Sequence, residues 1–383
     1  MISHRWRSIR SQVFAVGLAV AAVPPGLGAQ VLGTQPDLAM GQNGLPLLAY
    51  LNDNRLLIAW CSDPDCASIS AARDIDNLVG TPRIATRADG RPMIAYRGGS
   101  GGTLQAYDCA DTDCSGGTIR PLDAVSATGI NILVRDNGAP LIVYGDSNTA
   151  VRSMKVYDCD DANCSSGSAQ IPPGQQGLTD GGTGATLTSD GLPVIASNAL
   201  GVNGQNRMAV YGCADSGCTN GSVTYYEQSV STRLAFSSDN RTLIAFAGTG
   251  AALRFLACAD SACASGSPRG VLDSPVAVDM DLEVRVAGMP VTDLPVIAYS
   301  ASNQLRLYDC ENPSCSSGTA ITLDSSNPFI RYPAMVIRDD GTPLIVYSSS
   351  PDLYVISCQD SGCSQATSQA LAFNELFADG FEE

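Results

Sequence analysis

The hydrophobic positions of this chain recur in short runs, each of which follows a polar turn. Most of the runs begin directly after a proline. The seven stretches are "NGLPLLAY" (43–50), "DGRPMIAY" (89–96), "NGAPLIVY" (137–144), "DGLPVIAS" (190–197), "DNRTLIAF" (239–246), "TDLPVIAY" (292–299) and "DGTPLIVY" (340–347). Consecutive apolar residues over so short a length predict strands that are buried on both faces. Proline suits the first residue of such a strand, because that residue can lack a ladder hydrogen bond.

The segments around each run predict three more short strands per unit. The strand before the run ends at Asp-Gly or Asn-Gly in most units, which favours a tight two-residue hairpin turn because glycine accepts a positive φ. The strand after it alternates, as where Leu305 and Leu307 flank Arg306. The last strand, for example "GTAITLD" (318–324), is mostly polar and suits the outer edge of a sheet. Each unit therefore predicts four short antiparallel strands.

Fourteen cysteines keep step with these runs. They form seven pairs with four residues inside each: Cys61 and Cys66, Cys109 and Cys114, Cys159 and Cys164, Cys213 and Cys218, Cys258 and Cys263, Cys310 and Cys315, Cys358 and Cys363. An even number of cysteines in an exported chain predicts disulfides. Each bridge would close the hairpin between the third and fourth strands, with an Asp or Asn at the second loop position starting the turn. Zinc is the alternative, but seven scattered pairs do not gather four ligands around one ion.

Units of about fifty residues fill positions 36–373 and leave no room for a second domain. Four-stranded sheets repeated at this period predict an all-β fold, a seven-bladed β-propeller with one C-x4-C hairpin disulfide in each blade. A parallel β-solenoid is the alternative, although its coils are usually shorter. No exchange of strands between the first and last units is expected, because both begin and end at the same point of the repeat.

The recurrent DG-x-P-x-I-A-Y … C-x-D-x-x-C pattern also resembles the repeats of secreted bacterial β-propeller-like proteins, most of which have no assigned function. The resemblance covers nearly all of the chain after residue 29. It implies the fold and export, and it brings no catalytic residues. The fifth unit departs furthest from the pattern, with Asn240 in place of Gly, Thr242 in place of Pro and Leu256 in place of Tyr.

The two ends of the chain differ from the repeats. Residues 1–29 combine an arginine-rich start with an apolar run at 13–23 and small residues up to Ala29, which predicts a signal peptide. The run is too short to span a bilayer. Residues 374–383 form an acidic C-terminal tail that is similar to DGFE endings of other exported bacterial proteins, or is simply a disordered end. The predicted location is secreted or periplasmic, with no membrane insertion.

Charge and the lack of histidine narrow the functional classes. The formal net charge is −16, and removal of residues 1–29 would leave 19 basic residues against 38 acidic ones. This balance opposes nucleic acid and anionic membranes as partners, because their phosphates would be repelled. The one histidine, His4, lies within residues 1–29, so the repeats can form no Ser-His-Asp triad and no histidine-ligated metal site. No cofactor is predicted.

Functional residues are expected where the units differ. Candidate loops are 171–184, 198–207 and 279–293, which lie in the longest intervals of the repeat. Asp279 and Asp281 alternate along a predicted strand and should share a face, which favours a solvated face or a weak Ca²⁺ site over an acid–base pair. Asp158, Asp160 and Asp161 lie at a cysteine hairpin, where a solvated turn is the expected role.

Aromatic residues provide the remaining candidate contacts. Nine tyrosines recur at two matched positions of the repeat, which favours packing within the units. Tyr225, Tyr226 and Tyr332 fall outside these series and are the candidate ligand contacts, with packing on a strand face as the alternative. Trp60 is the one tryptophan after residue 29.

The sequence predicts a secreted, non-catalytic binding module for an unknown carbohydrate or protein surface; it makes no prediction of oligomeric state. One alternative is a carbohydrate-active hydrolase or lyase that works with carboxylates, Tyr and Arg. Another is a structural component of a surface or matrix. Acids, Arg and Tyr converging on the central channel would favour the enzyme, whereas a channel lined by small residues would favour binding or structure.

Overall fold

The computed structural model describes residues 30–77, 80–147, 153–174, 183–200, 206–227, 229–248, 250, 252–274, 277–287 and 292–372. The predicted signal peptide and the acidic tail lie outside these residues. Within the described ranges, no helix has the length and apolar character needed to cross a membrane.

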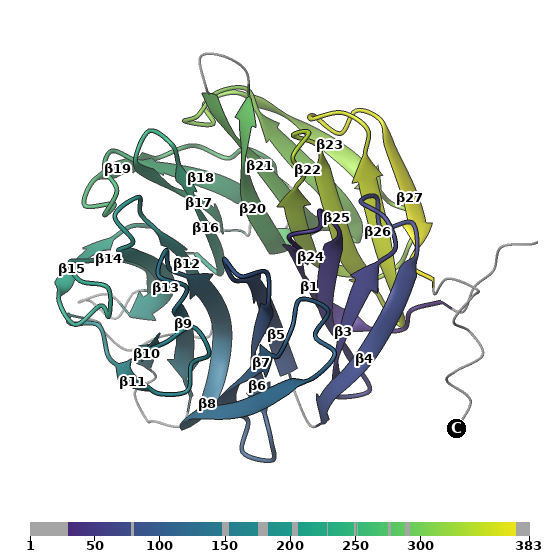
Figure 1. Ribbon diagram of the computed structural model, residues 1–383. Helices are drawn as coiled ribbons and strands as arrows, with labels where there is room; N and C mark the ends of the chain where they lie inside the picture. The colour runs from purple at the N-terminus through teal and green to yellow at the C-terminus, as the bar shows by residue number, and fades with distance from the viewer. Residues whose placement is uncertain are drawn as a thin grey trace, which may run out of the picture.

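The strands of the described residues lie in six antiparallel sheets arranged around a centre (Figure 1). The first sheet contains β1 (Thr34–Met40), β2 (Pro46–Asn52), β3 (Arg55–Cys61) and β4 (Ile69–Asn77). The second contains β5 (Gly80–Thr86), β6 (Pro92–Gly98), β7 (Thr103–Cys109), β8 (Gly117–Val134), β9 (Pro140–Asp146), β10 (Ser153–Cys159) and β11 (Gly167–Gln170). The third contains β12 (Gly184–Leu187), β13 (Pro193–Leu200), β14 (Asn206–Cys213) and β15 (Gly221–Tyr225).

The last three sheets have four strands each, in chain order. They are β16 (Ser231–Ser237), β17 (Arg241–Ala247), β18 (Leu253–Cys258) and β19 (Gly266–Pro268); β20 (Ala277–Ala287), β21 (Thr292–Ala301), β22 (Gln304–Cys310) and β23 (Gly318–Asp324); and β24 (Ile330–Ile337), β25 (Pro343–Ser349), β26 (Asp352–Cys358) and β27 (Ala366–Ala370). The first strand of each lies near the centre of the ring and the fourth lies at its rim (Figure 1).

The expectation of seven separate four-stranded sheets is wrong, because the second sheet has seven strands. Its middle strand, β8, is 18 residues long and serves two units. Residues 117–126 pair with β7, and residues 127–134 pair with β9. In the segment "DAVSATGI" (123–130) the outer strand of one unit runs directly into the inner strand of the next.

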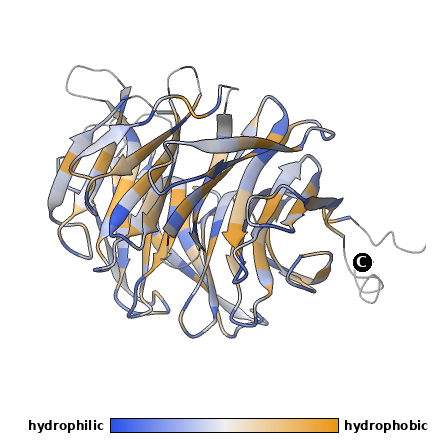
Figure 2. Ribbon diagram, turned by 90° about the horizontal axis from the view of Figure 1, so that it is seen from above, coloured by the Kyte–Doolittle hydropathy of each residue, from blue (hydrophilic) through white to orange (hydrophobic). Residues whose placement is uncertain are grey.

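The burial of the strands follows the predicted pattern. Every residue of β9 and of β25 is buried, whereas β27 is almost entirely exposed. Figure 2 shows the apolar residues concentrated along the strands and hydrophilic residues in many of the loops. The expectation that the matched tyrosines pack within their own units is wrong for those of the second strand, because they reach the preceding unit: Tyr96 donates to Asp76 over 2.9 Å and Tyr144 donates to Asp123 over 2.5 Å. These contacts tie the second strand of a unit to the fourth strand of the preceding unit.

Apolar clusters lie between successive units all around the ring. One of them packs Leu48 and Tyr50 of the first sheet against Leu344 and Val346 of the last, and so closes the ring. The closure also includes a backbone exchange that the sequence did not predict. The Val31 N–H donates to the Leu371 carbonyl over 2.8 Å, and the Leu353 N–H donates to the Val31 carbonyl over 3.0 Å. Residues just before the first unit therefore lie against the last sheet.

All seven predicted disulfides are present within single units, with Cα–Cα distances of 4.7–4.9 Å. The acid at the second loop position forms the turn, as expected. The Asp111 carboxylate accepts the Ser115 N–H over 2.8 Å, and the Asp215 carboxylate accepts the Thr219 N–H over 2.8 Å. The Asp-Gly turns differ slightly from the prediction: Arg87 and Arg91 bond across a three-residue loop rather than a two-residue one.

In four units an arginine of the first strand contacts the disulfide hairpins. In each of these units, a first-strand residue pairs with the proline that begins the apolar run of the second strand, and the arginine is the next residue in the chain. We call Arg87, Arg135, Arg285 and Arg338 the staple arginines. The other three units have Gly41, Thr188 and Ser237 there.

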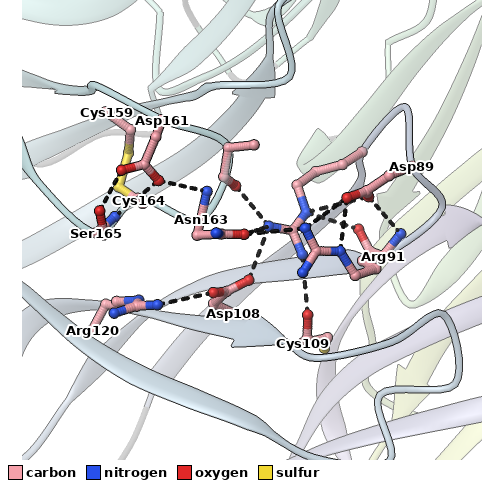
Figure 3. Close-up of polar contacts among 12 residues, drawn as sticks. Asp89, Arg91, Asp108, Cys109, Arg120, Cys159, Asp161, Asn163, Cys164 and Ser165 are labelled. Carbon is pink, nitrogen blue, oxygen red and sulfur yellow. Dashed lines mark hydrogen bonds and ion pairs between the residues drawn. A yellow bond between two sulfur atoms is a disulfide. The ribbon is translucent and has the colours of Figure 1, made fainter.

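Arg87 shows how a staple works. Its guanidinium donates to the Cys109 carbonyl over 3.1 Å and to the Ala162 carbonyl over 2.6 Å, and it pairs with Asp108 over 2.9 Å. Cys109 belongs to the hairpin of its own unit and Ala162 to the hairpin of the next. Figure 3 shows Asp108, Cys109 and the Cys159–Cys164 hairpin converging there, with Arg120 reaching Asp108 from the other side. The staple therefore joins neighbouring units at the disulfide hairpins.

Candidate functional site

The inner strands surround a cavity of about 420 Å³ at the centre of the ring. Its side chains come from the first strand of every unit, since residues near 37, 83, 131, 185, 233, 281 and 333 all line it. This cavity is the central channel, whose lining residues were expected to distinguish an enzyme from a binding protein.

One register position supplies most of the charge in the cavity. It lies opposite the residue that precedes the matched tyrosine in the second strand, as Asp37 lies opposite Ala49 and Arg83 lies opposite Ala95. Around the ring, this position is occupied by Asp37, Arg83, Asn131, Gly184, Arg233, Asp281 and Ala334. Two opposite pairs of charges therefore face the channel from neighbouring units.

The two charge pairs have the same form. Arg83 lies 3.8 Å from Asp37, and Arg233 lies 3.8 Å from Asp281. All four side chains keep about one-fifth of their surface exposed to the cavity. At 3.8 Å the partners are ion pairs rather than close hydrogen bonds, so polar surface on each side chain stays open to a ligand.

Both acids are fixed by backbone groups of the next unit. The Asp37 carboxylate accepts the Ile84 N–H over 2.7 Å, and the Asp281 carboxylate accepts the Met335 N–H over 2.8 Å. Burial raises the pKa of Asp37, against the opposing effect of Arg83. Burial also raises the pKa of Asp281 to about 6, against the opposing effect of Arg233. Perturbed carboxyl groups in a cavity are a common property of functional sites.

Glu283 lies two residues beyond Asp281, on the same face of β20. The equivalent residues of the other units are Ala39, Ala85, Leu133, Thr186, Ala235 and Val336, so the surroundings at this level are largely apolar. Burial, together with the negative charges of Asp281 and Asp37, raises the pKa of Glu283 well above its ordinary value of 4.5. Within the described part of the chain, Glu283 has no hydrogen-bond or ion-pair partner. It is therefore a carboxyl group that holds its proton to a higher pH than an ordinary glutamate does.

A second pair of charges lies just before the register position of Asp37, Arg83, Arg233 and Asp281 along the inner strands. Asp279 pairs with Arg331 over 2.9 Å, and the Asp279 carboxylate accepts the Tyr332 N–H over 3.4 Å. The Arg331 guanidinium carbon lies 5.6 Å from the centre of the Tyr332 ring. Tyr332 has a φ of +52°, and Gln35, Thr81 and Gly129 at the equivalent position also have positive φ. A repeated bulge thus turns the inner strands at this end of the cavity.

The structure separates the three tyrosine candidates. Tyr332 lines the central cavity. Tyr225 lies in the outermost strand of its sheet, opposite Ala209, and Tyr226 donates to the Cys263 carbonyl over 3.0 Å and packs between units. Only Tyr332 therefore accompanies the charged cluster.

Asp279 and Asp281 share a face, as predicted, and that face is the channel wall. Among the described residues, no group of three or more His, Cys, Asp or Glu side chains is arranged to hold a metal ion, so the Ca²⁺ hypothesis gains no support. Residues 175–182, 201–205 and 288–291 of the candidate loops lie outside the described residues.

The sequence analysis missed Asp37, Arg83, Arg233 and Glu283 as site residues. A signal for them exists, since each interrupts an apolar strand: "PDLA", "PRIA", "TRLA" and "LEV". Alignment of the seven inner strands would place the first three at one position.

No protein-family model matches the chain, and no curated protein matches it. Solved structures do match. A polysaccharide lyase of family PL25, an ulvan lyase bound to -[GlcA(1-4)Rha3S]-, is 12% identical with a TM-score of 0.57, and the match covers 91% of this chain and 99% of that one. BBS1N, solved in complex with ARL6DN, is 14% identical with a TM-score of 0.52, over 91% of this chain and 94% of that one.

A lectin from Aleuria aurantia, solved in complex with Fucalpha1-6GlcNAc, is 12% identical with a TM-score of 0.50, and the match covers 77% of this chain and 97% of that one. Identities this low show a shared fold and no more.

Proposed function

We propose that this protein is an exported carbohydrate-binding β-propeller and that its saccharide site is the central channel. Seven blades are counted when β8 is divided where its pairing changes from β7 to β9. The seven disulfides support residence in an oxidising compartment. The repeat pattern and the predicted signal peptide are consistent with a secreted bacterial protein of the repeat family that the sequence resembles.

The ring of charged side chains in the cavity carries this proposal. Asp37, Arg83, Arg233 and Asp281 offer carboxylate acceptors and guanidinium donors within one cavity of about 420 Å³. Sugar hydroxyl groups both donate and accept hydrogen bonds, so they suit a mixed set of this kind. Tyr332 adds an aromatic surface beside these polar groups. The volume lies within the usual range of small-molecule sites.

The similar structures support a carbohydrate ligand in part. The ulvan lyase and the Aleuria lectin were both solved with bound saccharides, whereas BBS1N was solved with a protein partner. The proposal of a saccharide ligand therefore rests on the chemistry of the cavity rather than on the shared fold.

The test incubates the purified protein with a panel of insoluble and soluble polysaccharides and measures depletion of the protein and release of products together. We expect depletion by at least one polysaccharide. Tyr332→Ala should reduce this binding about tenfold. Tyr225→Ala is the control: it removes a tyrosine that lies outside the cavity, and it should leave the binding unchanged. Thermal unfolding of both variants checks that they are folded. Failure of every polysaccharide to bind, or equal loss of binding in the two variants, would contradict the proposal.

Carbohydrate cleavage at the same site is the second candidate, and Glu283 favours it. By the criterion of the sequence analysis, acids, Arg and Tyr on the channel support an enzyme. In a hydrolase of this kind the protonated Glu283 would give its proton to the glycosidic oxygen as the bond from the anomeric carbon to that oxygen breaks. The Asp281 carboxylate would take a proton from a water molecule as the oxygen of that water forms a bond to the same anomeric carbon.

Glu283→Gln separates the two candidates, because glutamine has nearly the same shape and no acidic proton. If the protein is an enzyme, the variant keeps binding and loses product release. If wild-type protein depletes without releasing products, the binding function stands alone.

A further inference from the structure

The seam between the first and second units lacks the staple that other seams have. Gly41 occupies the position of Arg87, Arg135, Arg285 and Arg338. A pocket of about 280 Å³ lies there, lined by Gly41, Gln42, Asn43, Trp60, Thr112 and Asp113 among others. The pocket thus lies where a guanidinium group is bound elsewhere in the ring, and it is separate from the central channel.

The walls of this pocket correspond to the guanidinium sites of the stapled seams. Thr112 is at the hairpin position of Ala162, whose carbonyl accepts from Arg87 over 2.6 Å. Asp113 is at the hairpin position of Asp65, whose carboxylate pairs with Arg338. The first seam therefore presents the hairpin carboxylate without an arginine of this chain at the staple position.

Trp60 is a further difference between the first seam and the stapled seams. It takes the place of Asp108, the acid that pairs with Arg87 in the next unit. An indole is the best aromatic partner for a cation, and arginine is the side chain most often found with it. The indole Nε1–H of Trp60 is buried and has no acceptor among the described residues. That nitrogen is closed to solvent, so the chemistry of a pocket ligand is set by the indole ring and by Asp113, which both favour a cation.

We propose that this pocket binds the arginine side chain of a basic peptide or protein partner. The guanidinium supplies the cation for Asp113 and Trp60. The formal net charge of −16 favours a basic partner. This protein–protein function is independent of saccharide binding in the channel.

Trp60 reports directly on the pocket, because the only other tryptophan, Trp6, lies in the predicted signal peptide. The experiment records the tryptophan emission of the mature protein during titration with N-acetyl-arginine amide. Titration with N-acetyl-citrulline amide is the control, since citrulline has a similar shape and no charge. A saturable change with the arginine compound alone is expected. Guanidinium chloride, which lacks the side-chain methylenes and the peptide groups, should act only at much higher concentration. A tetrapeptide with one arginine then shows whether peptide-bound arginine binds more tightly than the single amino acid.

Two substitutions test the geometry. Asp113→Asn should weaken binding of the arginine compound about fivefold, whereas Asp136→Asn, the same change at an exposed turn of another unit, should leave it unchanged. Gly41→Arg should supply the guanidinium from within the chain, shift the emission without ligand and abolish the response. A Cβ at residue 41 would meet the Asn43 side-chain oxygen at 2.8 Å and the Leu45 carbonyl oxygen at 3.1 Å, so the turn at 41–45 has to shift by a few tenths of an ångström to accept it. An equal response to citrulline, a response to neutral sugars instead, or an unchanged affinity in Asp113→Asn would overturn the proposal.

Discussion

Arg338 of the last sheet pairs with Asp65 of the first, across 273 residues of sequence. The same guanidinium donates to the Cys358 carbonyl over 2.6 Å, and Ser357 donates to Asp65 over 2.7 Å. Hydrogen bonds from Ser357 and Arg338 lower the pKa of Asp65. The seam where the ends of the ring meet is therefore joined at its hairpins like the seam between the second and third units.

A staple arginine should contribute more to stability than a surface arginine. Arg87→Ala leaves Asp108, which is 7% exposed, with only the partial support of Arg120. We expect a loss of about 3 kcal/mol, because removal of one partner strands a buried charge. Arg55→Ala is the control: Arg55 also pairs with an aspartate, but 54% of its side chain is exposed, so the loss should stay below about 1 kcal/mol. Chemical denaturation of both variants measures the difference, and equal losses would refute the staple.

Local patterns in the sequence predict the units well, and contacts between units poorly. The cysteine pairs and the apolar runs after proline determine each sheet through neighbours a few residues apart, and the structure agrees with them. The division between the second and third units was predicted wrongly because the strand signal in β8 does not stop. The channel cluster joins residues such as Asp37 and Arg233, which are nearly two hundred positions apart. Only alignment of the repeats brings such residues together before the ring is known.

Each hairpin disulfide should give a modest and local stabilisation. Closing a loop of this length corresponds to about 2 kcal/mol in the chain-entropy model. Replacement of Cys109 and Cys114 together by serine should lower the free energy of unfolding by about that amount and leave the other six bridges intact. Peptide mapping without reduction should recover every bridge within its own unit. A bridge between units, or free thiols in the folded protein, would contradict this arrangement.

Of the residues before the first unit, those whose side chains are buried against the last sheet should stabilise the closed ring, and their exposed neighbours should not. Val31 is 1% exposed and bonds to the last sheet through both its N–H and its carbonyl, whereas its neighbour Leu32 is 46% exposed. Val31→Ala should therefore cost about 2 kcal/mol of stability. Leu32→Ala removes a larger side chain and should change the stability by no more than about 0.5 kcal/mol. If the two variants unfold at the same denaturant concentration, residues 30–33 do not take part in closing the ring.

Glu283 should make the fold less stable as the pH rises. Burial, with the charges of Asp281 and Asp37, raises its pKa in the folded protein above the value of the unfolded chain. The folded state then binds more protons than the unfolded state above about pH 4, so ionisation of Glu283 at higher pH lowers the free energy of unfolding. Glu283→Gln removes this effect. The variant should be more stable than the wild type at pH 8, and the advantage should shrink towards pH 4.

Thermal unfolding of both proteins at pH 4 and pH 8 measures this difference. Asp281, with a pKa of about 6, adds its own loss of stability between about pH 4 and pH 6 in both proteins. Its charge also acts on Glu283, so the difference between the two proteins includes the coupling of these two carboxyl groups. Glu311→Gln, the same change at an exposed hairpin residue, is the control variant. An advantage of Glu283→Gln that is equal at both pH values would mean that glutamine packs better there, and that Glu283 does not hold its proton in the channel.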